Sequence, residues 1–258
     1  MLIDSHCHLH FLDFSKTNDT VETVIERAKA NGVDHFLCVA TELSEYEILV
    51  QYAEQYPDVS ISIGVHPTNE PGHIFTEDDL MPLIDHPKLI AIGETGLDYF
   101  RLEGDLSWQR ERFRMQMNVA KQCKKPLIIH TRAAKEDTIQ LMHQEEARDI
   151  GGVIHCFTED WDMAKKCLDM DFLISFSGIV TFKNAKALQE VAMKVPLTHM
   201  LIETDSPYLA PVPYRGKQNE PSYVRHVADF IAELRGTSVE EIATATSNNF
   251  NRVFRNNL

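Results

Sequence analysis

The chain has 258 residues, of which 43% are hydrophobic and 25% are charged, a composition typical of globular proteins. Its net charge of −14 argues against a broad basic surface that binds nucleic acid through counterion release. A nuclease remains possible, because bound divalent ions would make its site locally positive. No run approaches the length of a membrane span. The first residues do not resemble a signal peptide, so none is expected.

Five cysteines are scattered along the chain, at Cys7, Cys38, Cys123, Cys156 and Cys167. An odd number without a CxxC pair predicts neither a disulfide framework nor a zinc ribbon. Cys7, Cys38 and Cys156 fall in strand-like runs and are expected to be small buried residues. We therefore expect a cytoplasmic protein, since the cytoplasm keeps thiols reduced.

Apolar runs and amphipathic segments alternate along the chain. Runs rich in Val, Ile, Leu and Phe predict buried strands at 2–8, 33–41, 59–66, 89–95, 126–131, 152–157, 172–178 and 199–204. Apolar residues at helical spacing predict helices at 18–31, 42–56, 76–86, 106–124, 134–147, 160–170, 184–194, 219–235 and 238–256. Gly32 suits the end of the first helix, and Thr237 or Ser238 suits the cap of the last. Eight such repeats predict an α/β fold, a (β/α)8 TIM barrel with additional C-terminal helices, as a single domain over 1–258.

Residues of the types that bind metals gather where these strands end. His6 and His8 share one face of the first strand, because side chains two residues apart point the same way. His66, Glu94, His130, His155 and Asp205 end later strands. The carboxyl ends of barrel strands meet at one rim, where active sites of this fold lie. Because buried carboxylates need partners, this convergence predicts a metal centre.

Imidazole and carboxylate ligands without thiolates suit Zn²⁺, Mn²⁺, Mg²⁺, Fe or Co. We expect two divalent ions bridged by Glu94. His6, His8 and Asp205 would lie on one side, and His130 and His155 on the other. Such a pair would lower the pKa of a water to give an attacking hydroxide, so Glu94 and Asp205 are the expected catalytic residues. Asp205 could also take a proton from the water.

An ordered set of motifs resembles the TatD-like deoxyribonuclease family of the amidohydrolase superfamily, over essentially the whole chain. The motifs are Asp4-Ser-His-Cys-His-Leu9, Gly64-Val-His-Pro67, Gly93-Glu-Thr-Gly-Leu-Asp-Tyr99, Pro126-Leu-Ile-Ile-His-Thr-Arg132, Gly152-Val-Ile-His-Cys-Phe157, Glu203-Thr-Asp-Ser-Pro-Tyr-Leu209 and Arg215-Gly-Lys-Gln-Asn-Glu-Pro221. The resemblance implies that His6, His8, Glu94, His130, His155 and Asp205 are metal ligands. It also implies a metal-dependent hydrolase, often a 3′→5′ exonuclease on DNA. Many dinuclear amidohydrolases bridge their metals with a carboxylated lysine, so a glutamate at position 94 favours this group.

Two residues near the expected ligands allow two interpretations each. His66 would contact substrate or a water near the metals, or only orient its neighbours. Glu203 lies two residues before Asp205 and shares its face. It would support a third, weaker metal position, or hydrogen-bond to a ligand histidine.

Substrate contacts are expected in the loops. Arg215 and Lys217 would bind a substrate phosphate, or their loop would only dock the C-terminal helices. Arg132 is a second candidate for a phosphate contact, and Tyr99 and Phe100 would either stack on a base or pack within their loop. The remaining histidines are expected to be structural or solvated; they are His10, His35, His73, His86, His143, His199 and His226.

Together these observations predict a metal-dependent hydrolase, a deoxyribonuclease that acts 3′→5′ on single-stranded DNA or DNA ends. We expect it to bind DNA weakly at the barrel rim, without an obligate protein partner. The alternative is a hydrolase of another ester or amide on the same site, such as a small phosphoester or an aminoacyl-tRNA ester, since a fold does not choose its substrate. A scaffold with a vestigial site is a third hypothesis, which the intact ligand set argues against.

Overall fold

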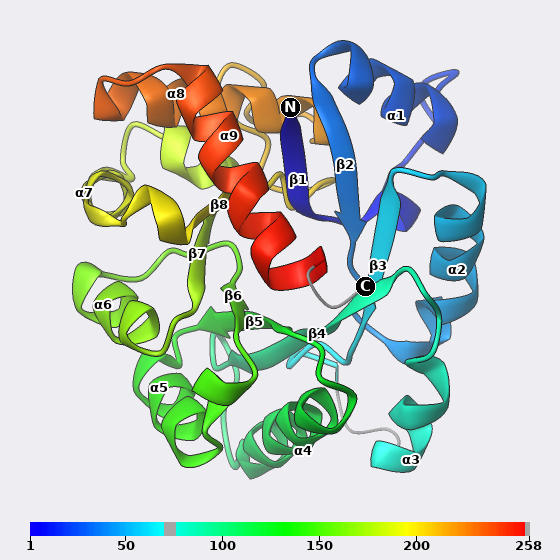
Figure 1. Ribbon diagram of the computed structural model, residues 1–258, viewed down its shortest axis with the longest axis vertical. Coiled ribbons are helices and arrows are strands. Elements are labelled where there is room, and N and C mark those ends of the chain that lie inside the picture. The colour runs from blue at the N-terminus through cyan, green and yellow to red at the C-terminus, as the bar shows by residue number, and fades with distance from the viewer. Residues whose placement is uncertain (70–75, 256–258) are drawn as a thin grey trace.

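The computed structural model describes residues 1–69 and 76–255. Eight parallel strands form one sheet in chain order and curl into a barrel, with helices around the outside (Figure 1). The strands are β1 (Leu2–Cys7), β2 (Val33–Cys38), β3 (Val59–Ile63), β4 (Leu89–Asp98), β5 (Leu127–Arg132), β6 (Gly152–Ile154), β7 (Leu173–Phe176) and β8 (Met200–Ile202). The predicted (β/α)8 barrel with C-terminal helices is confirmed.

Every predicted helix has a counterpart in the structure. The helices are α1 (Val21–Ala30), α2 (Tyr46–Gln55), α3 (Glu77–Leu80), α4 (Ser107–Cys123), α5 (Lys135–Gln144), α6 (Trp161–Asp169), α7 (Lys186–Lys194), α8 (Val224–Arg235) and α9 (Val239–Phe250). Ser238 caps α9 as predicted, because its hydroxyl accepts from the Glu241 N–H at 3.1 Å. Across residues 1–69 and 76–255, none of the helices is both long enough and apolar enough to cross a membrane.

Two predicted helices differ from the observed ones. The helix predicted at 76–86 is a single turn, α3, followed by a 3₁₀ turn at Met81–Leu83. Pro82 lacks a backbone N–H and cannot continue the α-helical hydrogen bonds. The helix predicted at 238–256 ends at Phe250 and continues as a π-turn over Asn251–Arg255. Residue 256 lies outside the described residues.

Several strands have other lengths than predicted, and this decides where the site residues lie. Four strands that carry site residues end earlier than predicted: β1 at Cys7, β3 at Ile63, β6 at Ile154 and β8 at Ile202. The predicted site residues His8, His66, His155 and Asp205 therefore follow their strands instead of ending them. β4 extends beyond the predicted 89–95 to Asp98, because its last residues pair with β5 up to Asp98 and Arg132. The longer β4 brings Asp98 to the same rim as Glu94.

The two ends of the barrel have different chemistry. Apolar side chains such as Ile3, Leu37 and Ile128 form an inner cluster that also contains Phe250 and Phe254 of the C-terminal segment. Asn249 of α9 donates to the carbonyls of Leu197 and Met200, beside the start of β8. The helix α9, red in Figure 1, therefore closes the N-terminal end of the barrel, and the opposite end is left for polar side chains.

The segment after β8 returns to β1 and brings Asp205 to the first strand. An isolated parallel bridge joins Cys7 and Ser206. The Asp205 N–H donates to the His6 carbonyl at 2.9 Å, and the His8 N–H donates to the Ser206 carbonyl at 2.8 Å. These bonds hold Asp205 beside the two histidines of β1.

Candidate metal centre

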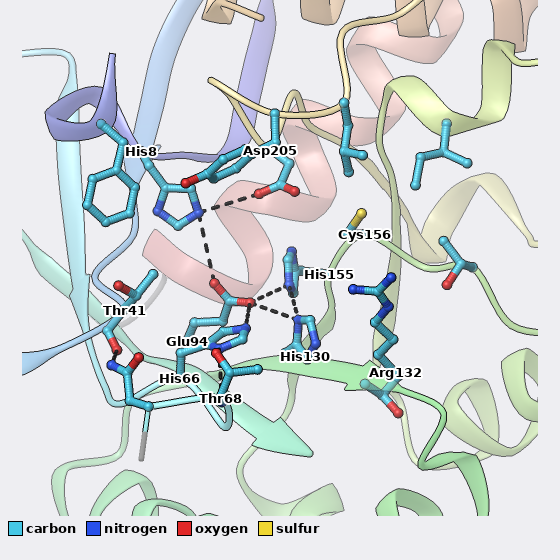
Figure 2. Close-up of a pocket in the computed structure, with 17 residues that line it drawn as sticks. His8, Thr41, His66, Thr68, Glu94, His130, Arg132, His155, Cys156 and Asp205 are labelled. Carbon is cyan, nitrogen blue, oxygen red and sulfur yellow. Dashed lines mark hydrogen bonds and ion pairs between the residues drawn. The ribbon is translucent and has the colours of Figure 1, made fainter. Parts of the chain in front are cut away.

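Glu94 lies at the centre of a group of histidines at the C-terminal rim (Figure 2). One carboxylate oxygen, Oε1, lies 2.7 Å from His155 Nε2 and 3.0 Å from His130 Nδ1. The other, Oε2, lies 3.5 Å from His6 Nε2 and 3.9 Å from His8 Nε2. The two oxygens face different pairs of histidines, which is the arrangement of a carboxylate that bridges two ions.

Asp205 completes the group on the β1 side. Its Oδ1 lies 3.4 Å from His8 Nε2 and 3.7 Å from His6 Nε2, and the two imidazole nitrogens lie 3.2 Å apart. Ligand atoms about 2.0–2.2 Å from a tetrahedral ion lie about 3.3–3.6 Å from one another. The spacing of His6, His8 and Asp205 therefore fits a cation between them, and these three residues form one of the groups that could hold a metal.

A backbone contact sets the tautomer of His8. Its Nδ1 lies 2.8 Å from the carbonyl oxygen of Val39, which can only accept. The proton of the neutral ring therefore sits on Nδ1, and the lone pair of Nε2 faces His6 and Asp205. Histidine ligands of metals are oriented in the same way, by a hydrogen bond from the nitrogen that does not bind the ion.

Asp98 holds His130 from the opposite side, and the sequence analysis did not single it out. Asp98 Oδ2 lies 3.0 Å from His130 Nε2, while His130 Nδ1 faces Glu94. Gln109 of α4 fixes Asp98 in turn, because its amide pairs with the Asp98 N–H and carbonyl, each at 2.9 Å. The even spacing from Glu94 within one motif could have indicated Asp98, since residues two apart share a strand face.

His66 joins the cluster, although the predicted ligand set omits it. Its Nε2 lies 3.3 Å from Glu94 Oε1, and its Nδ1 lies 2.7 Å from the hydroxyl of Thr68. His66, Glu94 and His130 form a second group whose atoms could hold one ion. His66 is therefore placed for direct coordination as well as for the predicted contact with substrate or water.

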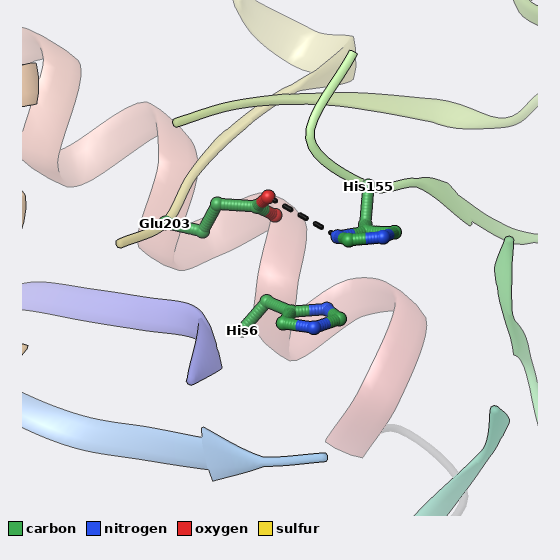
Figure 3. A group of neighbouring side chains, drawn as sticks. All are labelled: His6, His155 and Glu203. Atoms are coloured by element: carbon green, nitrogen blue, oxygen red, sulfur yellow. Dashed lines mark ion pairs between the residues drawn. The ribbon is translucent and has the colours of Figure 1, made fainter. Parts of the chain in front are cut away.

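Glu203 lies beside His155 (Figure 3), next to Nδ1, whereas Nε2 of the same ring faces Glu94. Glu203 accepts the Cys156 N–H at 2.7 Å, and the same oxygen lies 3.4 Å from His155 Nδ1. The His6 and His155 rings stack at 4.0 Å. His6 Nδ1, His155 Nδ1 and Glu203 Oε2 are buried without a hydrogen-bond partner among the described residues. Such orphaned atoms are costly unless they bind something, so this third group also fits a cation. Both interpretations of Glu203 stay predictions.

The electrostatics of the site favour positive charge. Burial raises the pKa of Glu94, but His155, His66 and His130 outweigh burial and hold this pKa well below its ordinary value. Burial likewise raises the pKa of Asp205, and the hydrogen bond to His8 with the nearby imidazoles brings it below the ordinary value. The carboxylates are therefore ionised at neutral pH. Divalent ions would supply the positive charge that they require.

A cavity of about 780 Å³ opens over this cluster. Its lining includes His8, His66, Glu94, His130, His155 and Asp205, together with Thr41, Arg132, Cys156, Ile179, Tyr208 and Leu209. Arg132, a predicted phosphate contact, is on its wall (Figure 2). Arg215 and Lys217 are exposed and are not among the lining residues, so their phosphate contact stays a prediction.

The predictions for the cysteines and for the two aromatic residues after β4 were confirmed only in part. Cys7 and Cys38 are buried as expected, but Cys156 is only half-buried and lines the cavity. The prediction for Cys156 failed because β6 ends at Ile154, two residues before it, and the backbone turns at Cys156, whose φ is +42°. Tyr99 donates its hydroxyl to Asp137 and packs in its loop, whereas Phe100 is exposed.

Of the other histidines that the structure describes, His10 lies at the edge of the ligand cluster, with its ring 5.9 Å from that of His8. His10 pairs with Glu45, His35 contacts Ser60, and His199 contacts Asp171, which are structural roles as expected. His73 lies outside the described residues.

Comparisons with known proteins agree with this geometry. The model of a family described as TatD related DNase matches residues 3–255. The chain is 46% identical to the uncharacterized metal-dependent hydrolase YcfH of Escherichia coli, over 98% of this chain and 95% of the relative. It is 43% identical to the uncharacterized metal-dependent hydrolase YabD of Bacillus subtilis, over the full length of both. The crystal structure of the TatD homologue YJJV of Escherichia coli superimposes with a TM-score of 0.88 at 28% identity, covering 98% of this chain and 97% of that one.

Proposed function

We propose, from the premise that this chain belongs to the TatD related DNase family and is a metal-dependent hydrolase, that it is a deoxyribonuclease. It would hydrolyse phosphodiester bonds of single-stranded DNA or DNA ends, in the 3′→5′ direction. The observation that carries this proposal is the position of Glu94, whose two oxygens face separate histidine pairs at the base of an open cavity. Such a site suits a substrate whose charged ester needs two cations.

The residues present fit two divalent ions, Mg²⁺, Mn²⁺ or Zn²⁺. His6, His8, Asp205 and Glu94 Oε2 would hold one, and His130, His155 and Glu94 Oε1 would hold the other, with His66 within reach. When bound, a pair of divalent ions lowers the pKa of water and neutralises charge on a phosphodiester. The spacing of His6, His8 and Asp205, and the position of Glu94 with its two oxygens toward different histidines, support this assignment.

Groups of the protein itself would transfer the proton, orient the histidines and bind the phosphate. Asp205 is ionised and faces the cavity, so it can accept the proton of the attacking water at Oδ1. Val39 and Asp98 fix the rings of His8 and His130, so that little reorganisation is needed during the reaction. The guanidinium of Arg132 on the cavity wall can bind a phosphate oxygen.

The charge of the chain limits how DNA would bind. A net charge of −14 repels a polyanion, so we propose weak, metal-dependent binding at the rim. We place the enzyme in the cytoplasm as part of the same proposal. The five cysteines, all of them free thiols, support this location.

Hydrolysis of a 5′-labelled single-stranded DNA oligonucleotide tests the proposal. Chelator-stripped protein is refilled with Mg²⁺, Mn²⁺ or Zn²⁺ and compared with an Asp205→Asn variant treated in the same way. We expect a metal-dependent ladder that shortens from the 3′ end and is absent in the variant. If folded, metal-loaded protein cleaves no DNA, the substrate is another ester or amide, such as a small phosphoester or an aminoacyl-tRNA ester.

A further inference from the structure

One side of the cavity mouth carries two arginines on a single aromatic ring. The guanidinium of Arg132 lies 3.7 Å from the centre of the Phe100 ring, and that of Arg101 lies 4.8 Å from it. Phe100 is 39% exposed. In the described part of the chain, neither arginine forms an ion pair with a carboxylate. Both charges are therefore available to an anion from solution.

A second set of cations and rings follows β8. Arg215 lies 4.3 Å from the centre of the Phe182 ring, and Lys217 lies 5.7 Å from that of Tyr214. Both cations are exposed, and neither pairs with a carboxylate in residues 1–69 or 76–255. The Tyr214 ring stacks on Tyr223 at 4.1 Å, which holds this part of the loop in place.

The loop that carries the second set is anchored to the cavity. Tyr208 and Leu209 line the cavity, and Tyr208 is 54% exposed. The Val212 N–H donates to the Thr181 hydroxyl at 2.9 Å, and Asn219 donates to the Tyr208 carbonyl at 2.6 Å. Arg215 and Lys217 therefore stand on a fixed loop that begins at the cavity wall.

The two sets lie on different loops of the barrel mouth, and Phe182, which Arg215 contacts, follows β7. Arg132 ends β5, whereas Arg215 and Lys217 follow β8, and β6 and β7 separate these two strands in the eight-stranded order. One cavity, lined by Glu94 and several of its histidines, is also lined by Arg132 of the first set and by Tyr208 and Leu209, where the loop of the second set begins. A chain that crosses the mouth over Glu94 would thus meet cations before and after the cluster.

The pairing of cations with rings indicates the kind of ligand. Elsewhere arginines such as Arg27, Arg114 and Arg225 donate to carboxylates, which neutralise them. A guanidinium stacked on a ring keeps its charge and its N–H donors, and its planar fork matches a phosphate. Phe100 and Tyr208 are exposed, whereas Phe182 and Tyr214 are half-buried. Exposed aromatic rings together with unpaired cations are the combination that binds single-stranded nucleic acid, through stacked bases and backbone phosphates. A small ester would need only the cavity.

We propose that Arg101, Arg132, Arg215 and Lys217 form a two-sided track for a single-stranded nucleic acid several nucleotides long. The track contacts backbone phosphates on both sides of the one held over Glu94. This inference rests on the proposed phosphodiesterase activity and adds to it the length of strand that the enzyme recognises. It predicts that substrates become better as they grow beyond a dinucleotide.

The first experiment compares metal-loaded wild-type protein on oligothymidylates of two to eight nucleotides. KM is expected to fall as the strand grows. The double variant Arg215→Gln/Lys217→Gln should raise KM for the octamer about fivefold to tenfold, and much less for the dinucleotide. Its octamer binding should also lose about 1.4 units of the slope of log K against log salt, since each single-strand phosphate contact contributes about 0.7.

The matched control removes two cations from the opposite end of the barrel. Arg148 and Lys194 are exposed and precede β6 and β8, respectively. The double variant Arg148→Gln/Lys194→Gln changes the net charge equally and should bind and cleave like wild type. Binding is measured separately by fluorescence anisotropy of a labelled octamer with phosphorothioate linkages on metal-loaded protein whose proposed ligands are all intact, so that cleavage does not consume the probe.

The results of these experiments distinguish failure of the track from failure of the proposed phosphodiesterase activity. If the octamer binds no more tightly than the dinucleotide, or if the two double variants behave alike, the track does not exist. Hydrolysis of bis(p-nitrophenyl) phosphate, which is too small to reach Arg215, reports the cluster alone. Failure to hydrolyse this diester, combined with octamer binding that depends on Arg215 and Lys217, would refute the proposed activity and leave the track standing.

Discussion

Replacing Asp98 by Asn tests how the ring of His130 is held in place. The carboxylate is buried, and its Oδ2 lies 3.0 Å from His130 Nε2. Asparagine has nearly the same shape, and its carbonyl oxygen can still accept the Phe100 N–H, which lies 2.9 Å from Asp98 Oδ1. The substitution therefore removes one charged hydrogen bond to His130 and little else.

The size of the effect follows from this single contact. A hydrogen bond to a charged group contributes about 1.5–3 kcal/mol. At about 1.4 kcal/mol for each factor of ten, Asp98→Asn should weaken an ion held by His130 about 10-fold to 100-fold. In the proposed arrangement, an ion held by His6, His8 and Asp205 would make no contact with Asp98 and should bind as it does in the wild type.

Titration calorimetry of chelator-stripped protein with Mn²⁺ or Zn²⁺ measures both sites. Asp171→Asn is the matched control, because Asp171 Oδ1 lies 2.9 Å from His199 Nε2 in a similar contact away from the cluster. This control should bind both ions normally. If Asp98→Asn also binds both ions like wild type and keeps full activity, Asp98 does not orient His130, and our account of the second ion is wrong.

Three further predictions concern stability. His10 has a pKa of about 9 in the folded protein, because Cys38 and Glu45 outweigh the opposing effect of burial. Its contribution is fully present below its ordinary pKa of 6.5 and is lost as pH rises through 9. Burial raises the pKa of the Cys38 thiol, but Cys7 and His10 outweigh burial and hold this pKa well below its ordinary value, so the thiol contributes in the opposite direction over the same window. The free energy of unfolding, measured with urea between pH 6.5 and 9, should therefore fall by less than about 3 kcal/mol, the change that His10 alone would give, and His10→Gln should change this pH dependence. The buried amide of Gln116 hydrogen-bonds to the N–H and the carbonyl of Val65 and to the Thr95 hydroxyl, and Gln116→Leu would leave all three groups without this partner. We expect a cost of about 2–4 kcal/mol in urea unfolding, against under about 0.5 kcal/mol for Gln122→Leu on the exposed face of the same helix. Gly96→Ala would place a Cβ 2.0 Å from the backbone oxygen of His130 at a φ of +129°. It should cost more than about 4 kcal/mol or prevent folding. Gly216→Ala has no atom within 4 Å of the added Cβ but has a φ of +87°, so it should cost only the backbone strain, about 1–2 kcal/mol. Equal losses for both glycines would contradict the steric argument.

Much of the fold could be predicted from the sequence, because its causes are local. The runs of Val, Ile, Leu and Phe must be covered on both faces, and the amphipathic segments between them must cover something, so a parallel barrel follows. The positions of His6, His8, Glu94 and His130 follow equally, because a strand alternates its faces and all barrel strands end at one rim. Strand ends were less accurate, since β4 and β6 end where their neighbours stop pairing.

Only the tertiary structure decided which atoms face one another. Asp98 reaches His130 because β4 and β5 pair to their ends, and His66 reaches Glu94 because the backbone after β3 turns toward the cavity. Arg132 and Arg101 meet on the Phe100 ring, and Arg215 lies on the Phe182 ring, through loops whose course depends on packing. The alternation of apolar runs with amphipathic segments thus determined the barrel, and the residues at the ends of those runs determined which candidate metal ligands share its rim. Long-range contacts set the orientation of each imidazole and the surface around the site, because residues far apart in the chain supply both partners of those contacts.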